Sequence, residues 1–527
     1  MEKRKVFTRE ATGLVREISG IGSFGVAVTG VGVISIFLFY QYFMISTGDN
    51  PLLSIGLMAL PFLALATTWA MLAMAFPRSG GDYVFNSRTL HPTIAVMGDF
   101  LLVMTLPGVL TFFIATDTGL MADMLHVDGF LSGNPGLISI GSSLGNPTVQ
   151  FVIMTIAVIV TMFFLIGRTR IFIQTQAIVQ ILNIVLFVIL MGVLAATSNS
   201  SYQSLFTNVF KIDYNSILSS ASNSGFTTPT LLGVSLFGTS FLIFWLPGPQ
   251  WAAHVGGETQ RPQKTLLYSI VGAQLLMIIL FLIAGFVCFN TYGSTFSYAA
   301  NYVASGSNNP FPMSQANFLG LMVPVLGSPI IISVVFIVMM LGGYFIGAMA
   351  VMAVSRHVFA WSFDRLIPSK FSEVSERFRT PVWDAVLVAI IAEVYGILNI
   401  YGPGVFLYVS ALGPVYSGIA WGISSLAGVL LPLKKGFFEQ APPLVRKKIG
   451  NIPVISLISA FAFVTIIGLL LLGQIIPTFQ GGLAPGPVIW TFAIFFAGLP
   501  FYYIVRAYRL KHDGFDLSMV YKQIPPD

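Results

Sequence analysis

Charged residues are scarce in this chain, and their scarcity excludes an ordinary soluble protein. Only 9% of the 527 residues are Asp, Glu, Lys or Arg, whereas 55% are hydrophobic. A soluble globular domain carries about 25% charged residues. The mean hydropathy of +0.85 agrees with this comparison. The composition therefore predicts an all-α polytopic membrane protein.

Cysteine is also nearly absent. Cys288 is the single cysteine, so an intramolecular disulfide is excluded. No spacing of His or Cys is typical of a metal site, and no pair of a nucleophile and its base is evident. We therefore predict no metal, no cofactor apart from a coupling ion, and no enzymatic activity. A channel is disfavoured because the sequence shows no ring of repeated charge and no filter motif.

Long apolar runs are what the chain does contain. A helix needs about 17–25 apolar residues to cross a bilayer, and twelve segments fall in or near that range. The tails, 1–17 and 505–527, are polar, and we expect an external loop at 196–230 and a cytoplasmic loop at 432–453. We place the spans at 18–44, 52–76, 93–116, 149–166, 171–195, 231–254, 266–289, 329–355, 382–400, 405–431, 454–476 and 488–504.

The basic residues give these spans an orientation. If the N-terminus is cytoplasmic, 25 of the 26 Lys and Arg residues fall on the cytoplasmic side, and only Lys211 falls outside. Lys and Arg collect in cytoplasmic loops of membrane proteins. The pattern therefore predicts that both termini are cytoplasmic. It also accounts for the net charge of +6 without a nucleic-acid partner.

Two of the spans are interrupted in the middle. The first contains Gly30-Val31-Gly32, and the sixth contains Pro247-Gly248-Pro249. Because the two spans lie five apart, a repeat of five helices would place the second copy upside down. Paired interruptions in inverted halves indicate the binding site of a secondary transporter. The alternatives are glycines that serve close helix packing and a Pro-Gly-Pro that only kinks its helix.

The broken backbone suits a zwitterionic ligand. A half-helix starting near Val33 would point free N–H groups at the break, and these attract a carboxylate. The half-helix ending near Phe244 and Trp245 would leave carbonyls that suit an ammonium group. We predict a substrate site at Thr29, Gly30, Val31, Gly32, Phe244, Trp245, Leu246, Pro247 and Gly248.

Three further stretches carry a family resemblance. They are Phe76–Tyr83 (FPRSGGDY), Glu258–Pro262 (ETQRP), and Ser355–Ala360 together with Asp364, Pro368 and Thr380-Pro381-Val382. The sequence resembles the amino acid–polyamine–organocation (APC) superfamily of transporters. The resemblance implies a LeuT-type fold of two inverted five-helix repeats, 18–195 and 231–431, with discontinuous helices 1 and 6 and two extra helices within 454–504. It also implies alternating access and an aromatic gate at Phe244 or Trp245.

The sequence departs from the family pattern at two places. Many members carry an acidic residue after the sixth-span break, where this chain has Gln250. Some proton-coupled members place a Lys in span 5, which here contains none and offers Asn183 as the nearest polar candidate. A lysine-based proton mechanism is therefore disfavoured, and coupling to Na⁺, to H⁺ at another site, or to no ion stays open.

Ionisable residues supply the remaining candidates. We expect a cytoplasmic gate of salt bridges among Arg78, Asp82, Glu258, Arg261, Arg356 and Asp364, with Ser355 beside them; ordinary interfacial solvation is the alternative. Glu393 lies near the middle of span 9. A carboxyl at that depth is either a coupling site or a structural hydrogen-bond partner. We interpret His254 as a packing histidine rather than a titrating one.

These observations favour a plasma-membrane permease. No acidic residue is evident near either break, and a cationic substrate would need one. We therefore predict ion-coupled symport of neutral, apolar amino acids by a monomer or homodimer in the bilayer. The alternatives are another small substrate on the same fold (a polyamine, an organic cation or a nucleobase) and a transporter-like amino-acid sensor.

Overall fold

The computed structural model describes residues 16–45, 50–167, 169–227, 230, 236–375, 380–402, 413–475 and 485–524. Within these ranges, eleven helical segments are long and apolar enough to cross a membrane. The expected all-α membrane architecture is therefore confirmed. The predicted sixth span is not among the eleven, since its described part contains only a short α-helix.

The first predicted span is broken where the sequence indicates. α1 (Gly20–Thr29) ends just before Gly30, and α2 (Ile34–Ile45) resumes after Val33. Gly32 has a φ of +69°, a conformation that favours glycine. The spans that follow are α3 (Pro51–Ala75), α5 (Pro92–Thr105) continued by α6 (Gly108–Ser132), α8 (Pro147–Gly167) and α9 (Thr169–Ala195), with the short α4 (Gly81–Thr89) between α3 and α5.

The sixth span differs from the prediction after its break. α12 (Leu236–Trp245) is α-helical, but the second half consists of two 3₁₀ turns, η1 (Pro249–His254) and η2 (Gly256–Glu258). The second half of the discontinuous helix 6 that the resemblance implies is therefore 3₁₀ rather than α-helical. The predicted residues 231–235 lie outside the described part. The later spans are α13 (Pro262–Tyr292), α16 (Pro329–Phe363), α17 (Val382–Tyr401), α19 (Gly413–Leu430) with η5 (Leu431–Leu433), α21 (Val454–Ile475) and α22 (Pro485–Asp513).

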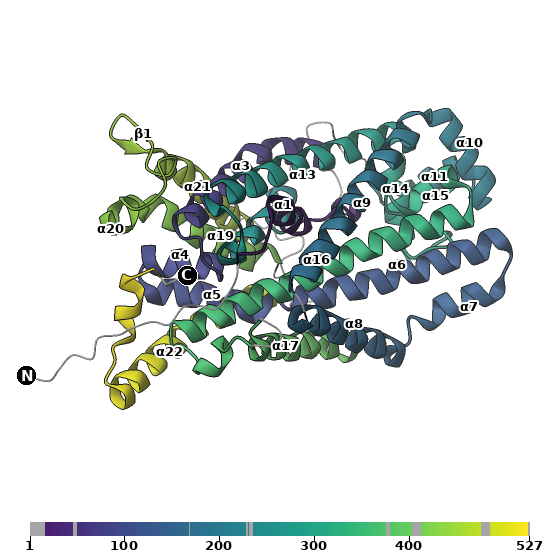
Figure 1. Cartoon of the computed structure of the whole chain (residues 1–527). Helices are drawn as coiled ribbons and strands as arrows, with labels where there is room; N and C mark the ends of the chain where they lie inside the picture. Colours follow the sequence, from purple (N-terminus) through teal and green to yellow (C-terminus); the bar gives the residue numbers. More distant parts are fainter. Residues whose placement is uncertain are drawn as a thin grey trace, which may run out of the picture.

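Short helices gather at one end of the bundle (Figure 1). The segment expected as an external loop, 196–230, contains two short helices there, and the third span continues as far as Ser132. Aromatic contacts hold this layer together, including Tyr214 stacked on Phe296 with ring centroids 3.8 Å apart. Its elements are α7 (Pro135–Ser143), α10 (Asn199–Phe210), α11 (Tyr214–Asn223), α14 (Ser294–Ala304), η3 (Gly320–Met322) and α15 (Val323–Leu326).

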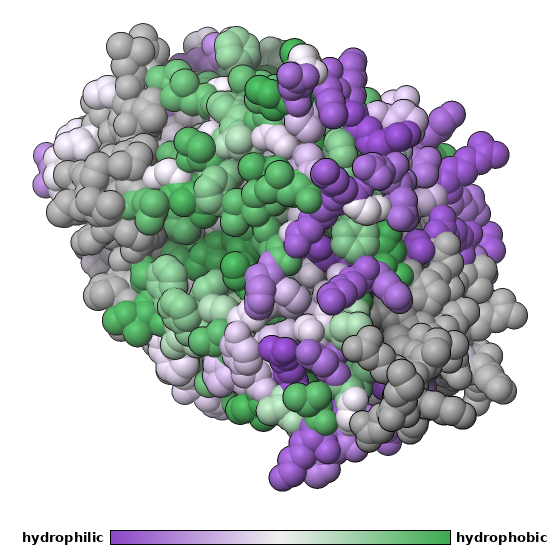
Figure 2. All heavy atoms as spheres, turned by 90° about the vertical axis from the view of Figure 1, so that its left-hand side faces the viewer, coloured by the Kyte–Doolittle hydropathy of each residue, from purple (hydrophilic) through white to green (hydrophobic). Residues whose placement is uncertain are grey.

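The opposite end, which we call the α4 end, carries α4, the β-hairpin and the last described turn (Figure 1). Strands β1 (Lys448–Ile449) and β2 (Ile452–Pro453) pair antiparallel, with Ile449 opposite Ile452. Seen from this end, hydrophilic residues cluster beside a broad hydrophobic area (Figure 2). The distribution of Lys and Arg predicts that the α4 end faces the cytoplasm. Its other short elements are η4 (Ser369–Ser372), α20 (Lys435–Phe438) and η7 (Leu517–Lys522).

Candidate functional site

The two helix breaks lie directly against each other. A Cβ atom added to Gly30 would collide with the carbonyl oxygen of Gly248, and one added to Gly248 would collide with that of Gly30. The same Cβ on Gly248 would lie 2.7 Å from the Val31 nitrogen. Only glycine lets two backbones approach so closely. The interruptions of spans 1 and 6 therefore form a single crossing.

A small cavity opens beside this crossing. Its volume is about 40 Å³. Both breaks contribute to it, as do the turn between α5 and α6 and the elements α2, α6, α12, η1, α16 and α19, so segments far apart in the sequence meet here. It is lined by Gly30, Val31, Ser35, Leu106, Val109, Phe113, Phe244, Trp245, Pro247, Trp251, Ile346, Tyr416, Ser417 and Trp421.

The lining is apolar and aromatic. None of the fourteen lining residues is charged, and side-chain hydroxyls come only from Ser35, Tyr416 and Ser417. Phe244 packs edge-on against Trp245, with ring centroids 5.3 Å apart, and against Tyr416 at 6.2 Å. A site of this kind accommodates an apolar side chain and leaves the recognition of charge to the backbone at the helix ends.

The comparisons with known proteins agree with this geometry. A family model described as amino acid permease matches residues 18–507, which include both breaks and the whole cavity lining. The chain belongs to the amino acid permease family. The resemblance to the APC superfamily is thereby confirmed, and the family is one of transporters rather than enzymes. No individual curated protein matches the sequence.

Five of the nine predicted substrate residues line the cavity of this permease: Gly30, Val31, Phe244, Trp245 and Pro247. The other four lie at the crossing without lining it. A Cβ on Gly32 would meet Ile346, and Gly248 packs on Gly30. Leu246 is buried, and its carbonyl accepts a hydrogen bond from Gln274 at 3.2 Å. The hydroxyl of Thr29 is bonded to the Gly25 carbonyl and to Gln176.

Two glutamines of span 5 reach the first break, although the sequence analysis passed over them. Gln176 on α9 contacts Thr29, and Gln180 lies one helical turn further along near Gly32. Both are buried. Their four-residue spacing on an apolar helix was the signal that could have identified them. The predicted Asn183 instead ties α9 to α16, because its amide donates to the carbonyls of Val179 and Val338.

Gln250 occupies the position after the break where family members carry an acid. It is buried in η1, and its Nε2 has no hydrogen-bond partner among the described residues. Trp251 beside it lines the cavity, and its backbone N–H donates to the Gly248 carbonyl. Gln250 therefore lies in the same turn as the cavity residue Trp251, and the Gln250 side chain is uncharged.

The predicted gate residues Glu258 and Arg356 form a buried ion pair at the α4 end of the permease. Arg356 donates from Nε and Nη2 to the two carboxylate oxygens of Glu258, at 2.7 and 3.2 Å. The backbone around them is also joined, since Ile18 N–H donates to the Glu258 carbonyl and Gly80 N–H to that of His254. The start of α1, the α3–α4 loop, η2 and α16 are thus tied together.

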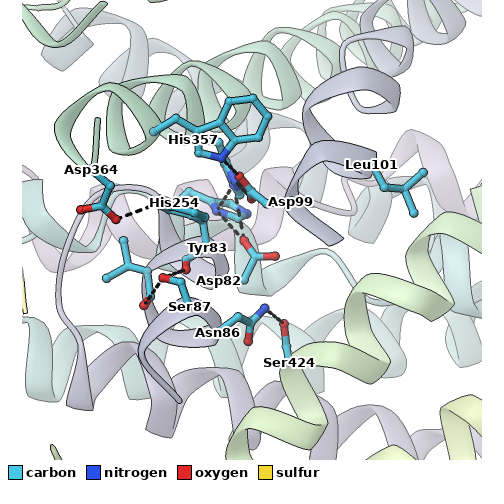
Figure 3. A network of polar contacts seen from close by, with 12 residues as sticks. Asp82, Tyr83, Asn86, Ser87, Asp99, Leu101, His254, His357, Asp364 and Ser424 are labelled. Carbon is cyan, nitrogen blue, oxygen red and sulfur yellow. Dashed lines mark hydrogen bonds and ion pairs between the residues drawn. The ribbon is translucent and has the colours of Figure 1, made fainter. Parts of the chain in front are cut away.

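A second buried pair joins α4 to the end of α16. Arg88 donates to the two carboxylate oxygens of Asp364 at 2.6 and 2.8 Å. The Tyr83 hydroxyl donates to the same carboxylate (Figure 3). Arg88 also donates to the Gln523 carbonyl near the C-terminus. Asp364 is a predicted gate residue, and its partner Arg88 is identified by the structure.

Asp82 lies against two histidines (Figure 3). Its Oδ1 is 3.6 Å from His254 Nδ1 and 3.4 Å from His357 Nε2. His357 is hydrogen-bonded to His254 on one side and to Asp99 on the other. Burial raises the pKa of the Asp82 carboxyl to about 7, and His357 offsets part of that rise.

Three other predicted gating or coupling residues make different contacts. The Ser355 hydroxyl donates to the Met352 carbonyl of its own helix. Arg78 is half-buried and donates to the Pro77 carbonyl at 3.1 Å. Glu393 on α17 accepts a hydrogen bond of 2.6 Å from Thr155 on α8. That contact matches the structural alternative for Glu393, because it joins two outer helices away from the cavity.

Proposed function

We propose that this permease is a secondary active transporter that carries neutral, apolar amino acids across the plasma membrane by alternating access. The observation that carries the proposal is the crossing of two helix breaks beside a cavity without charged residues. The carboxylate of the substrate binds at the start of α2, and its ammonium group binds at the end of α12. Its side chain fills the space between Phe244, Trp245 and Val109.

The size of the cavity supports a cycle of closed and open states. A single water needs roughly 10–15 Å³ of such volume, and the cavity has about 40 Å³. The site must widen to admit an amino acid and narrow again around it. The ion pairs at the α4 end keep that side closed in the described conformation. The LeuT-type arrangement of 18–195 and 231–431 supplies the two halves that move.

We further propose that transport is coupled to an ion that binds beside the first break. The side-chain amide of Gln180 is buried, and neither its oxygen nor its nitrogen has a hydrogen-bond partner among the described residues. Such atoms are satisfied by an ion or by water. Amide and backbone oxygens suit a hard cation, which favours Na⁺ over H⁺ as the driving ion.

The test is uptake of labelled leucine, valine and alanine into proteoliposomes that hold the purified permease. A sodium gradient, a proton gradient or neither is imposed. We expect accumulation under the sodium gradient, competed by unlabelled neutral amino acids and not by arginine or glutamate. Accumulation only under the proton gradient would assign H⁺ as the driver. Competition by arginine or a polyamine would contradict the proposed substrate class.

Phe244→Ala tests the aromatic wall of the cavity. The substitution removes a half-buried ring that lines the cavity and packs against Trp245 and Tyr416. We expect the KM for leucine to rise about tenfold or more, corresponding to roughly 1–3 kcal/mol of apolar contact, while alanine uptake changes less. Leu282→Ala, a half-buried residue of α13 outside the cavity, serves as the matched control. Equal effects on leucine and alanine would contradict the placement of the side chain.

A further inference from the structure

Three potential metal ligands converge at the α4 end from three separate elements. Asp82 comes from α4, His254 from η1 and His357 from α16, and all three are buried (Figure 3). Their facing atoms are Asp82 Oδ1, His254 Nδ1 and His357 Nε2. These atoms are separated by 3.6, 3.4 and 2.9 Å.

Those separations match the edges of a small coordination polyhedron. Zn²⁺ binds imidazole nitrogen and carboxylate oxygen at about 2.0–2.2 Å, so adjacent ligands in a tetrahedral site lie roughly 3.3–3.5 Å apart. Two of the three edges are already near this value, and a bound cation would lengthen the contact between the histidines. Two imidazoles and one carboxylate leave the fourth position for water.

An unsatisfied ligand atom points into the same space. Asp82 Oδ1 is buried and has no hydrogen-bond partner among the described residues. A buried carboxylate oxygen without a partner is costly. A cation between the three groups would satisfy this oxygen and replace the contact between the two histidines.

The surroundings of His357 resemble the outer shell of a metal site. Its Nδ1 is hydrogen-bonded to Asp99, and the Trp361 indole N–H donates to the other oxygen of the same carboxylate. A metal-bound histidine commonly donates its second ring N–H to a carboxylate, which fixes the ring and its tautomer. Asp99 and Trp361 would hold Nε2 of His357 toward Asp82 and His254.

The local charge also favours a divalent cation. Asp82 and Asp99 bring two carboxylates to one buried cluster. The two buried arginines of this end are engaged by other carboxylates, Arg356 by Glu258 and Arg88 by Asp364. A dication would balance Asp82 and Asp99 while both histidines stay neutral, the form in which imidazole binds metals.

We propose that Asp82, His254 and His357 form a binding site for a divalent transition-metal cation of the Zn²⁺ class, with Asp99 and Trp361 as positioning residues. The cation would clamp α4, η1 and α16 together. Provided that the proposed alternating access holds, a bound cation stabilises the conformation closed at the α4 end and slows transport.

The experiment measures binding on the full-length permease in detergent, without a histidine tag and after removal of metals by a chelator. Zn²⁺ is titrated by calorimetry, and Co²⁺ is used as a spectroscopic probe. We expect one Zn²⁺ per chain and the visible absorption of four-coordinate Co²⁺. His254→Gln and Asp82→Asn should each weaken Zn²⁺ binding at least tenfold.

His126→Gln is the matched control, because half-buried His126 lies on α6, contacts the nearby Ser142 hydroxyl and belongs to none of the three elements of the cluster. It should leave Zn²⁺ binding unchanged. Size-exclusion profiles and melting temperatures check that the variants are folded. Absence of Zn²⁺ binding to the wild type, or equal binding by wild type and a folded His254→Gln variant, would overturn the proposal.

A transport measurement tests separately whether Zn²⁺ bound at this site slows uptake. Micromolar Zn²⁺ should slow uptake by wild type and not by His254→Gln. If Zn²⁺ binds but leaves uptake unchanged, the metal site stands and the clamp is refuted. If no substrate is transported at all, the binding data remain valid while the proposed transport function fails.

Discussion

We expect Gly248→Ala to abolish amino acid uptake. The added methyl group would overlap the carbonyl of Gly30 and come within 2.7 Å of the Val31 nitrogen, and both belong to a backbone that cannot rotate away. The two breaks would be forced apart at the proposed substrate site. We expect uptake in proteoliposomes to fall at least a hundredfold, since displacements of about 1 Å have effects of that size in organised sites.

Gly192→Ala is the control for this prediction. Gly192 lies in α9, and a Cβ there meets no atom within 4 Å. The control should transport like wild type, and surface labelling or reconstitution yield should confirm that both variants enter the membrane. Near-normal uptake by Gly248→Ala would show that the crossing opens during the cycle and is not needed as a contact.

Arg356→Met produces the largest expected loss of stability. Arg356 and Glu258 have side-chain exposures of only 3% and 8%, and the substitution leaves the Glu258 carboxylate buried without its partner. Removing one member of a buried ion pair costs about 3–5 kcal/mol. We expect a clearly lower melting temperature of the purified permease, partly restored in the double variant Glu258→Gln/Arg356→Met.

An exposed pair gives the comparison. Arg506 and Asp516 are 38% and 35% exposed, and Arg506 Nε lies 2.9 Å from the carboxylate. Solvent screens such pairs, which contribute about 0–1 kcal/mol. Arg506→Met should therefore shift the melting temperature much less than Arg356→Met. Equal shifts in melting temperature would mean that burial does not determine how strongly the Arg356–Glu258 pair stabilises the permease.

The breaks were predictable because their cause is local. The apolar runs are interrupted in the sequence itself, by Gly30, Gly32, Pro247 and Pro249. A proline without an N–H, or a glycine, disrupts a helix within one turn of its own position. The rotation of a helix about its axis is set by packing against other helices and not by the local sequence. Thr29 therefore points toward α9 rather than into the cavity. The polar residues of span 5 that lie beside the first break are Gln176 and Gln180, not the predicted candidate Asn183.

The cavity residues on the other spans could be identified only from the fold. Three of these residues lie on α19, namely Tyr416, Ser417 and Trp421. The turn after α5 contributes Leu106, and α6 contributes Val109 and Phe113. Nothing in an apolar helix distinguishes the side that faces a cavity from the side that faces a neighbouring helix. The same reason hid the cluster of Asp82, His254 and His357, whose members are separated by 172 and 103 positions in the chain.

The length of α16 has a mechanical consequence. One uninterrupted helix, Pro329–Phe363, contributes Ile346 to the cavity and Arg356 and His357 to the α4 end. At 1.5 Å per residue, the helix is about 50 Å long, and Ile346 lies about 16 Å from His357 along its axis. A rod of this kind acts as a lever, so a tilt that separates Arg356 from Glu258 also moves the wall at Ile346. Opening of the α4 end and widening of the cavity would then be a single movement.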